Sequence, residues 1–316
     1  MPGGVDPKLV SHCRKPRWMG CPTKGVMKPP GTMSAIQNWC PNSSERREIW
    51  RWIIFKKLGF YKRVPRSHQV HTGGKIIGVR WVDVNKGDAT DTNYRSRLVG
   101  REFNIGRDDA LYAATPSLEA LRVVISHVAT HSQGRTRRSV MVNDVRRAYF
   151  YAKIQRDVYI ELPEEDEMHG KMLGKLKLCL YGTRDAPKRW EAFLAEQLVA
   201  LGFAKGRASP CCYWHAALGV RCIVHGDDFV LTGSAGALDE VKAGMHKRFL
   251  LKELGRLGGS AGELMELRVL NRVILWTREG LKYEADPRHA ENIVRGVAGA
   301  EKGVSAPCRV YTSDAA

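Results

Sequence analysis

Aspartates interrupt apolar runs at two places in the sequence. Asp144 lies in the apolar run 140–145, and the adjacent pair Asp227-Asp228 lies in the middle of the run 220–232. Aspartate is a poor strand former, and neighbouring carboxylates repel each other unless a cation lies between them. Two divalent metal ions held by such carboxylates can contact both the attacking and the leaving oxygen of a phosphoryl transfer. The pattern therefore indicates phosphoryl-transfer chemistry, with Asp144, Asp227 and Asp228 as candidate catalytic residues and metal ligands.

The aspartate pair also has a purely structural explanation. Gly226-Asp227 is typical of a tight hairpin turn, and for the pair alone a solvated turn is the more common case. Asp144 on a second expected strand, together with a strongly basic chain, favours the catalytic interpretation. Magnesium prefers carboxylate and phosphate oxygens, so a bound nucleotide would complete the coordination of the metal.

The charge of the chain points to a polyanionic partner. The 316 residues carry a formal net charge of +18, and residues 1–66 alone hold 14 Lys or Arg against three Asp or Glu. Such an excess is typical of proteins that bind nucleic acid, although a solubilising surface or a basic tail would also explain it.

The sequence shows no signal for export or for a membrane. No apolar stretch is long enough to span a bilayer, and residues 1–20 lack the apolar segment of a signal peptide. The eight cysteines show no paired spacing, so we expect reduced thiols rather than disulfides or zinc ligands. We therefore expect a cytoplasmic or nuclear protein that is not secreted and has no membrane partner.

Helical and strand periodicities alternate irregularly along the chain, which predicts an α+β fold rather than a doubly wound sheet. Residues 1–43 are rich in Pro, Gly and basic residues and are expected to form a flexible tail. Thr115-Pro116 and Pro187 are typical helix starts, and Gly202 is a typical helix end. Strands are expected at 75–84, 94–103 and 140–145 and on both sides of a turn in 220–232, and helices at 44–58, from 115, at 187–202 and at 238–250.

Several segments, in their order along the chain, resemble the copia-type reverse transcriptases. Residues 94–101 are similar to the family's K-x-R-L-V-A-R segment, and residues 143–163 to its D-V-x-x-A-F-L and V-Y-M-x-x-P block. Residues 180–190 resemble S-L-Y-G-L-K-Q-A-P-R-x-W, and residues 225–228, which read H-G-D-D, stand where the family has Y-V-D-D. The resemblance extends from about residue 50 to residue 289. It implies a right-hand polymerase with fingers, an antiparallel-sheet palm backed by helices, and a partial thumb.

This resemblance divides the chain into five parts. The expected parts are a basic tail at 1–43, a fingers-like region at 44–138, a palm with the catalytic carboxylates at 139–233, a thumb-like or connection region at 234–307, and a tail at 308–316 that matches nothing in the family.

The activity that the resemblance implies is that of an RNA-directed DNA polymerase. Such a nucleotidyltransferase extends a primer 3′-hydroxyl with deoxynucleotides by two-metal-ion phosphoryl transfer, using two Mg²⁺ ions or, alternatively, Mn²⁺. Its partners would be an RNA or DNA template with a primer and deoxynucleoside triphosphates. The ribonuclease H and integrase segments of the Pol polyprotein are expected elsewhere. A retrotransposon polymerase would act in cytoplasmic virus-like particles or in the nucleus.

The roles of the family transfer onto particular residues. Asp144 and Asp227 would hold the metal ions with help from the Val145 carbonyl, and Asp228 would be a less direct carboxylate. Tyr149 would exclude a ribose 2′-hydroxyl, although core packing would also explain an aromatic residue there. The nucleotide-binding residues implied by the resemblance are Arg95, Arg97, Val145, Tyr149, Tyr181 and Gly182.

Some positions depart from the pattern of the family. His225-Gly226 replaces Tyr-Val beside the aspartate pair, Asp185 replaces a glutamine and adds a negative charge near the pocket, and a glycine-rich run replaces a compact apolar segment at 258–262. Two alternatives to an active polymerase therefore remain open. One is a catalytically inactive remnant that still binds RNA or DNA, and the other is a two-metal nuclease.

Overall fold

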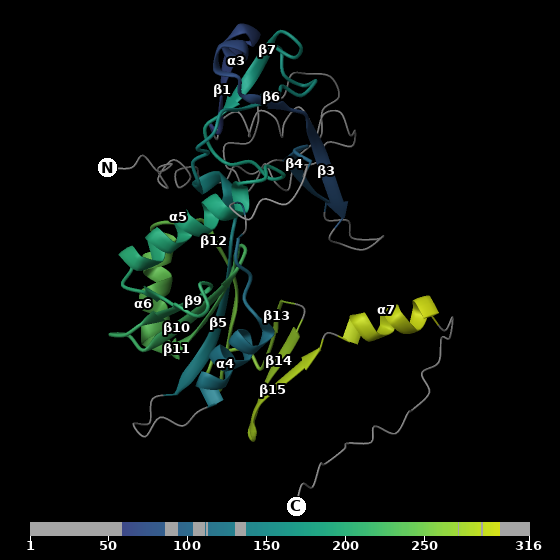
Figure 1. Cartoon of the computed structure of the whole chain (residues 1–316). Helices are drawn as coiled ribbons and strands as arrows, with labels where there is room; N and C mark the ends of the chain where they lie inside the picture. Colours follow the sequence, from purple (N-terminus) through teal and green to yellow (C-terminus); the bar gives the residue numbers. More distant parts are fainter. Residues whose placement is uncertain are drawn as a thin grey trace, which may run out of the picture. The chain divides into compact units, whose positions relative to one another are not determined.

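The computed structural model describes residues 59–85, 94–103, 111, 113–129, 137–270, 272–285 and 287–297. The chain divides into two compact units, residues 1–254 and residues 255–316 (Figure 1). The predicted tails at 1–43 and 308–316 and the predicted helix at 44–58 lie outside the described residues.

The larger sheet of the first unit is built around three antiparallel strands. β5 pairs with β11, and β11 pairs with β10. Their apolar residues are buried on both faces, because helices cover both sides of the sheet. In spatial order the strands are β12 (Leu251–Leu257), β5 (Arg138–Val145), β11 (Asp228–Ser234), β10 (Val220–His225), β9 (Cys212–His215) and β8 (Ala204–Lys205).

Helices α5 (Ala186–Ala200) and α6 (Ala235–His246) pack on one face of this sheet (Figure 1). Pro187 lies in the first turn of α5, where its missing N–H is not needed. The Ser234 side chain caps α6 by accepting a hydrogen bond from the Ala237 N–H. The core that the two helices share with the sheet contains Met141, Val145, Trp190, Leu194, Leu198, Leu231, Leu238, Met245 and Phe249.

Helix α4 (Leu118–Ala129) covers the opposite face of the sheet. Its His127 lies 3.1 Å from the Thr232 hydroxyl of β11, within hydrogen-bonding distance. Because side chains alternate along a strand, Thr232 and Asp228 share this face, whereas Leu231 faces α5 and α6. Helix α4 therefore packs against the later part of β11, and Asp228 is the first residue of the same strand.

The start of α4 differs from the prediction. The sequence predicted a helix capped by Thr115, with Pro116 as its first residue, but the helix begins at Leu118. The Ser117 hydroxyl accepts a hydrogen bond from the Ala120 N–H at 3.1 Å, so Ser117 takes the capping position that Thr115 could also have filled.

A smaller sheet in the first unit has the strand order β1-β7-β6-β2, and a separate hairpin is formed by β3 and β4. The predicted strand at 75–84 is wrong in one respect, because it is broken at Gly78. Its first part pairs with β6 and its second part with β4. The elements are β1 (Tyr61–Pro65), α3 (Arg66–Thr72), β2 (Lys75–Ile77), β3 (Val79–Asn85), β4 (Tyr94–Gly100), η3 (Ala148–Tyr151), β6 (Val158–Glu161) and β7 (Met172–Leu176).

The second unit contains an antiparallel sheet of β13 (Glu266–Val269), β14 (Arg272–Thr277) and β15 (Gly280–Ala285), followed by α7 (Pro287–Val297). In the glycine-rich run before β13, Gly259 lies against Trp276, and a Cβ atom there would come within 2.8 Å of the indole nitrogen. Among the described helices, none is long and apolar enough to cross a membrane. The mixture of helices and sheets that the sequence predicted is confirmed.

Candidate active site

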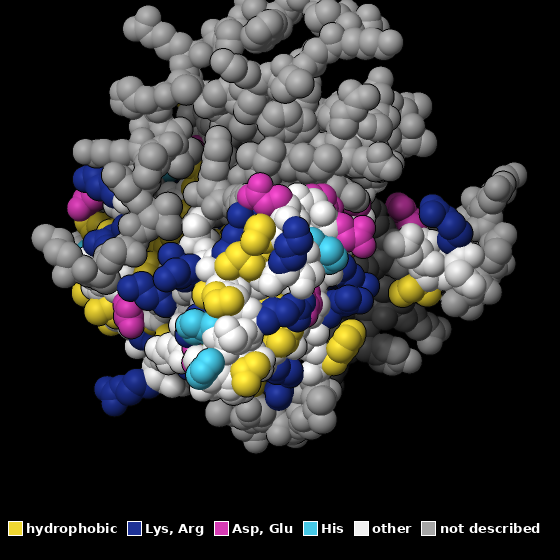
Figure 2. All heavy atoms as spheres, turned by 90° about the horizontal axis from the view of Figure 1, so that it is seen from above, with side chains coloured by type: hydrophobic (Ala, Val, Ile, Leu, Met, Phe, Trp, Pro, Cys, Tyr) yellow, Lys and Arg dark blue, Asp and Glu magenta, His cyan; other side chains and the backbone are white. Residues whose placement is uncertain are grey.

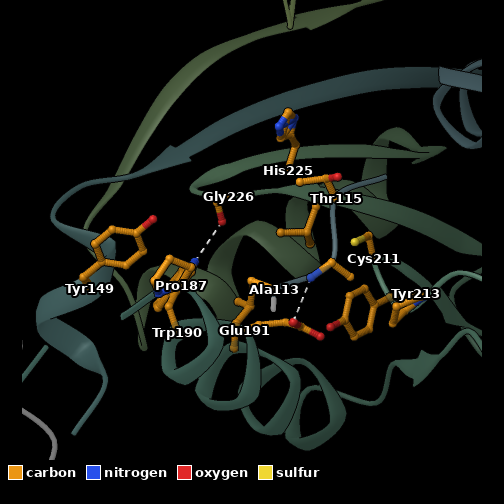
Figure 3. A pocket seen from close by; sticks show the side chains of 14 residues that line it. Ala113, Thr115, Tyr149, Pro187, Trp190, Glu191, Cys211, Tyr213, His225 and Gly226 are labelled. Carbon is orange, nitrogen blue, oxygen red and sulfur yellow. Dashed lines mark hydrogen bonds between the residues drawn. The ribbon is translucent and has the colours of Figure 1, made fainter. Parts of the chain in front are cut away.

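The aspartate pair lies at a two-residue turn between β10 and β11. β10 ends at His225 and β11 begins at Asp228, so Asp228 is the first residue of a strand and only Gly226 and Asp227 form the turn. Gly226 has a φ of +64°, a conformation that glycine adopts without the cost of a Cβ. The Trp190 indole N–H donates a hydrogen bond to the Gly226 carbonyl at 2.8 Å (Figure 3).

Strand register brings the carboxylates of two distant segments together. Asp144 of β5 is the direct partner of Asp228 across the antiparallel pair, and residues in that relation have Cβ atoms roughly 5 Å apart. The Val145 N–H donates to the carbonyl of Asp227 at 2.9 Å, which fixes the turn against the end of β5. Like charges at facing positions are destabilising, so this end of the sheet favours a bound cation.

A cavity of about 260 Å³ adjoins the carboxylates. The rings of Tyr149 and Tyr181 lie 4.7 Å apart between their centroids, and the Arg97 guanidinium carbon lies 5.5 Å from the centroid of the Tyr181 ring. Burial, and then the charge of Asp227, raises the pKa of Tyr181 to about 12, so its hydroxyl stays neutral and able to donate at pH 7. The cavity is lined by Arg97, Ala148, Tyr149, Tyr181 and Asp227.

Backbone contacts join the Tyr181 loop to the end of β4. The Gly100 N–H donates to the Tyr181 carbonyl at 2.7 Å. Gly182 has a φ of +83°, and a Cβ atom there would lie 2.1 Å from the carbonyl oxygen of Gly100. Only glycine allows two backbones to approach so closely in this conformation. The strand that carries Arg97 is therefore fixed directly to the loop that carries Tyr181.

Two neighbouring aromatic residues of the short helix η3 have different surroundings. Phe150 is 6% exposed and belongs to the core, where its ring lies 5.4 Å from that of Phe60. Tyr149 is half-buried and faces the cavity, and burial, followed by the charge of Asp227, raises its pKa. The turn into η3 depends on Arg147, which has a φ of +59°, a conformation that is uncommon for residues other than glycine.

Tyr149 also lines a second cavity of about 290 Å³ beside the turn (Figure 3). Glu191 of α5 accepts a hydrogen bond from the Ala114 N–H at 3.1 Å in its wall, and its other carboxylate oxygen pairs with Lys205 at 3.2 Å. Among its lining residues, Trp190 holds the turn through its hydrogen bond to Gly226, and Val224 and His225 are the last residues of β10 before the turn. The turn is thus supported from beneath by α5.

The structure brings most of the predicted site residues together. Asp144 and Asp228 face each other, and Asp227 lines the cavity with Arg97, Tyr149 and Tyr181. The Val145 side chain is buried in the core, and its N–H is bonded to the turn. The side chain of Arg95 in β4 lies outside the described residues.

Two features of the site were not predicted from the sequence. Trp190 is a buried core residue of α5, and its indole N–H donates a hydrogen bond to the Gly226 carbonyl. A buried indole generally needs such an acceptor, which is the signal that could have shown this contact. Asp185, which was expected to add charge near the pocket, is buried and paired with Arg156 at 2.7 Å. Within the described residues, no three His, Cys, Asp or Glu side chains gather closely enough to form a metal site by themselves.

Comparison with known proteins places this geometry in a family. A family profile for reverse transcriptase (RNA-dependent DNA polymerase) matches residues 66–264, which is more than half of the chain. The chain belongs to the reverse transcriptase family. The matched range contains the three aspartates and both cavities.

Curated relatives of this reverse transcriptase domain are transposon polyproteins. The retrovirus-related Pol polyprotein from transposon TNT 1-94 of Nicotiana tabacum is 28% identical over 211 residues, which cover 63% of this chain and 15% of that protein. The retrovirus-related Pol polyprotein from transposon RE1 of Arabidopsis thaliana is 27% identical over 200 residues, which cover 60% of this chain and 13% of that protein. The chain spans less than a fifth of the length of these relatives. The resemblance to the copia-type reverse transcriptases is confirmed.

Proposed function

We propose that the chain is an RNA-directed DNA polymerase domain that extends a primer 3′-hydroxyl with deoxynucleoside triphosphates. In this reaction the hydroxyl oxygen bonds to the α-phosphorus, and the bond from that phosphorus to the departing pyrophosphate breaks. The observation that carries the proposal is the cavity beside Asp227, which combines a carboxylate, the Arg97 guanidinium and two tyrosine rings. The folding pattern we propose for it is that of a right-hand polymerase, whose palm is the sheet of β5, β11 and β10.

The donor set fits a hard divalent cation. Asp144, Asp227 and Asp228 offer carboxylate oxygens at one end of the sheet, which suits Mg²⁺ or Mn²⁺. Because Mg²⁺ is usually held by one or two carboxylates together with substrate phosphates, a bound nucleotide would complete the coordination. When bound, the two metal ions would neutralise charge on the attacking and leaving oxygens. We propose Asp144 and Asp227 as the direct ligands, assisted by the Val145 carbonyl, and Asp228 as a nearby carboxylate.

The remaining cavity residues have roles in holding the nucleotide. Arg97 would bind the triphosphate through charge-assisted hydrogen bonds, with Arg95 of the same strand as a second candidate. Tyr181 and Gly182 would line the base and sugar side. Tyr149 would exclude a 2′-hydroxyl; the proposal is supported by its position facing the cavity, while its neighbour Phe150 is buried in the core. Catalysis would then rest on positioning and electrostatics rather than on a covalent intermediate.

A basic surface supports the assignment of a primed RNA or DNA template as the partner. Figure 2 shows the end of the first unit formed by β1, α3 and β7, where Lys and Arg side chains are interspersed with histidines and apolar side chains, with Asp and Glu side chains along one edge. Exposed basic residues in these elements and beside them include Lys62 and Lys171, whereas Arg66 is paired with Glu161. Such a surface binds phosphates without reading sequence. The ribonuclease H and integrase activities of a complete Pol polyprotein would be supplied by other segments.

A primer-extension assay tests the proposal. Purified protein is incubated with a 5′-labelled primer on an RNA template, the four deoxynucleotides and Mg²⁺, and Asp144→Asn is the matched inactive control. We expect extension by the parent and none by the variant, with equal template binding in both. Binding without extension by the parent would identify an inactive remnant, and shortening of the primer or template would identify a nuclease. Either result would refute the polymerase assignment.

A further inference from the structure

An ion cluster with two buried carboxylates lies outside both cavities. Arg156, in the loop before β6, makes two parallel hydrogen bonds to Glu102 at 2.7 and 2.5 Å and a third to Asp185 at 2.7 Å. Glu102 also pairs with Lys75 at 3.3 Å and accepts a hydrogen bond from the Arg184 N–H at 3.0 Å. Arg156, Glu102 and Asp185 line neither described cavity.

The cluster joins the two chain segments that carry the cavity residues. Glu102 follows the end of β4 and lies five residues beyond Arg97, whereas Asp185 follows the loop of Tyr181 and Gly182. Arg156 bridges these two carboxylates. Besides the Gly100–Tyr181 hydrogen bond and the hydrogen bond from the Arg184 N–H to Glu102, it is a further attachment between the strand of Arg97 and the loop of Tyr181.

We propose that Arg156, clamped between Glu102 and Asp185, is a positioning residue that sets the distance between Arg97 and Tyr181 and thereby the affinity for the incoming deoxynucleotide. The proposal rests on the proposed function for its effect on the nucleotide, but its structural part stands on the ion cluster alone.

The chemistry of the cluster suits a rigid link. The side chains of Glu102 and Asp185 are 1% and 2% exposed, so each carboxylate depends on its partners rather than on water. Burial alone would raise the pKa of Glu102, but hydrogen bonds from Arg156 and from the Arg184 N–H lower it to about 2. A guanidinium has a planar fork that matches a carboxylate in two hydrogen bonds, which lysine cannot reproduce. The link therefore has a defined geometry and stays charged throughout the physiological pH range.

The same unit offers a matched control at a remote site. Arg63 of β1 also bridges two carboxylates, Asp166 at 2.7 Å and Glu167 at 2.7 Å, and the Asp166 side chain is fully buried. Arg63 and Arg156 are similarly exposed, at 25% and 34% of their side chains. The Arg63 cluster joins β1 to the segment before β7 and contains no residue of the cavity. Loss of either arginine should destabilise the fold, but only the loss of Arg156 should loosen the cavity.

The experiment compares Arg156→Met with Arg63→Met in the full chain. Steady-state extension of a primed template gives KM for the deoxynucleotide and kcat, and a gel-shift titration gives the Kd for the template. For Arg156→Met we expect KM to rise about tenfold with a smaller change in kcat, because a displaced triphosphate contact weakens binding in the ground state and the transition state alike. For Arg63→Met we expect KM within about twofold of the parent. Template Kd should be unchanged in both.

Hydrogen exchange gives a second reading that needs no polymerase activity. Exchange is followed by mass spectrometry in peptides that contain the amides of Gly100 and Arg184. We expect faster exchange of these amides in Arg156→Met than in Arg63→Met at equal distance below each melting temperature. Arg156→Lys, which keeps the charge but loses the fork, should lie between Arg156→Met and the parent, and it replaces Arg156→Met should that variant fail to fold.

Two results would overturn the positioning role. One is equal hydrogen exchange of the Gly100 and Arg184 amides in Arg156→Met and Arg63→Met, and the other is an unchanged KM in both Arg156→Met and Arg156→Lys. A parent that does not extend primers would refute the proposed function instead, and the exchange comparison would still decide whether Arg156 holds the two segments together.

Discussion

The carboxylates reach one end of the large sheet through continuous strand pairing, whereas Arg97 and Tyr181 meet through a few polar contacts and apolar packing between segments that are not paired as strands. β5 and β11 pair over seven consecutive residue pairs, from Arg138–Ser234 to Asp144–Asp228. By contrast, the strand of Arg97 and the loop of Tyr181 are not paired as strands; one backbone hydrogen bond, the Glu102 ion cluster and a shared apolar core that includes Leu98 and Leu180 join them. We call these two parts the carboxylate side (Asp144, Asp227 and Asp228) and the arginine–tyrosine side (Arg97, Tyr181 and Gly182).

The difference concerns what each side tolerates. A register with many cooperating hydrogen bonds resists local change, since a slip would turn every side chain of the strand to the other face. Two segments joined by packing and a few polar contacts, without a strand register, can shift relative to each other when one of these contacts is lost. We therefore expect substitutions on the carboxylate side to remove chemistry without moving the backbone, and substitutions around the arginine–tyrosine side to change geometry and hence nucleotide affinity.

The largest effect is expected from Asp227→Asn. It preserves the shape of the turn, whose carbonyl still accepts from the Val145 N–H, but it removes the charge proposed to hold metal. We expect kcat for primer extension to fall by about 10³-fold or more, with template affinity unchanged. Single-turnover extension measures the first quantity and gel shift the second.

Asp228→Asn separates catalysis from stability on the same side. Its side chain faces Asp144 directly, so loss of one of two facing like charges should raise the free energy of unfolding by about 0.5 kcal/mol in metal-free buffer. We expect a smaller loss of kcat than for Asp227→Asn. Equal losses in the two variants would contradict the less direct role of Asp228.

On the arginine–tyrosine side, Gly182→Ala should be the most damaging single change. The added Cβ would meet the Gly100 carbonyl oxygen at 2.1 Å in a backbone conformation with a φ of +83°. The loop must therefore move away from β4, and we expect kcat/KM for the deoxynucleotide to fall by about 10²-fold through a misplaced pocket. The assay is steady-state extension with a single deoxynucleotide.

The control for that change is Gly170→Ala. Gly170 has a φ of +72° but no atom within 4 Å of an added Cβ. It should lose about 1 kcal/mol of stability from the backbone conformation and keep kcat/KM. A similar loss of kcat/KM in both variants would show that positive φ, not close approach, explains the need for Gly182.

The carboxylate side was largely predictable from the sequence. Asp227 and Asp228 are adjacent, the flanking runs have strand periodicity, and a two-residue Gly-Asp turn has few alternatives. The partnership of Asp144 with Asp228 required only that the two apolar strands pair in the register that aligns their carboxylates. The functional roles of these residues stay predictions.

The arginine–tyrosine side was not predictable from local pattern. Tyr181-Gly182 alone is typical of a turn, and only the resemblance to a family suggested a pocket. The partners of Arg156 lie 54 and 29 residues away in the chain, and no periodicity connects them. The break in the predicted strand at Gly78 was missed for the same reason, that local pattern does not identify distant partners. The two halves of the predicted strand pair with different strands, β6 and β4.

The face of the sheet that carries Asp228 should be sensitive to acid through His127. Burial, and then the charges of Arg221 and Arg138, lower the pKa of His127 to about 4, below the value of about 6.5 in an unfolded chain. The unfolded state therefore binds the extra proton first, so stability is complete above about pH 6.5 and declines as the pH falls towards 4. Between pH 7 and pH 5 we expect a loss of about 2 kcal/mol from this group.

Urea unfolding at several pH values checks this expectation, with His127→Gln as the comparison. The variant should show a flatter decline of the unfolding free energy over the same window. Parallel curves for the parent and the variant would mean that His127 has the same pKa in the folded and the unfolded state, so that its burial beside Thr232 does not affect its protonation.

Tyr149 lies where the two sides meet, and its substitution should change selectivity more than rate. Removing the ring in Tyr149→Val opens space beneath the sugar, and we expect the preference for deoxynucleotides over ribonucleotides to fall by about tenfold, because a pocket without a steric wall discriminates weakly against an added hydroxyl. The measurement is the ratio of kcat/KM for the two nucleotides. Phe150→Leu, in the buried neighbour, should lower stability and leave the ratio constant; a constant ratio in Tyr149→Val as well would make Tyr149 a packing residue.

The smallest expected effect on activity concerns Asn143, which is next to Asp144 in β5 but on the other face of the sheet. Asn143 is 1% exposed and lies opposite Phe229 in the core, and among the residues that the structure describes neither its amide nitrogen nor its amide oxygen has a hydrogen-bond partner. A buried amide without partners costs stability, whereas an apolar side chain of similar size does not. Asn143→Leu should therefore raise the free energy of unfolding by about 1 kcal/mol, measured by urea denaturation. Because continuous pairing holds β5 in register, kcat/KM should stay within about twofold of the parent. A destabilised variant would show that the amide has a partner such as an internal water. A large loss of activity would show that the carboxylate side depends on core packing as closely as the arginine–tyrosine side depends on the contacts between its two segments.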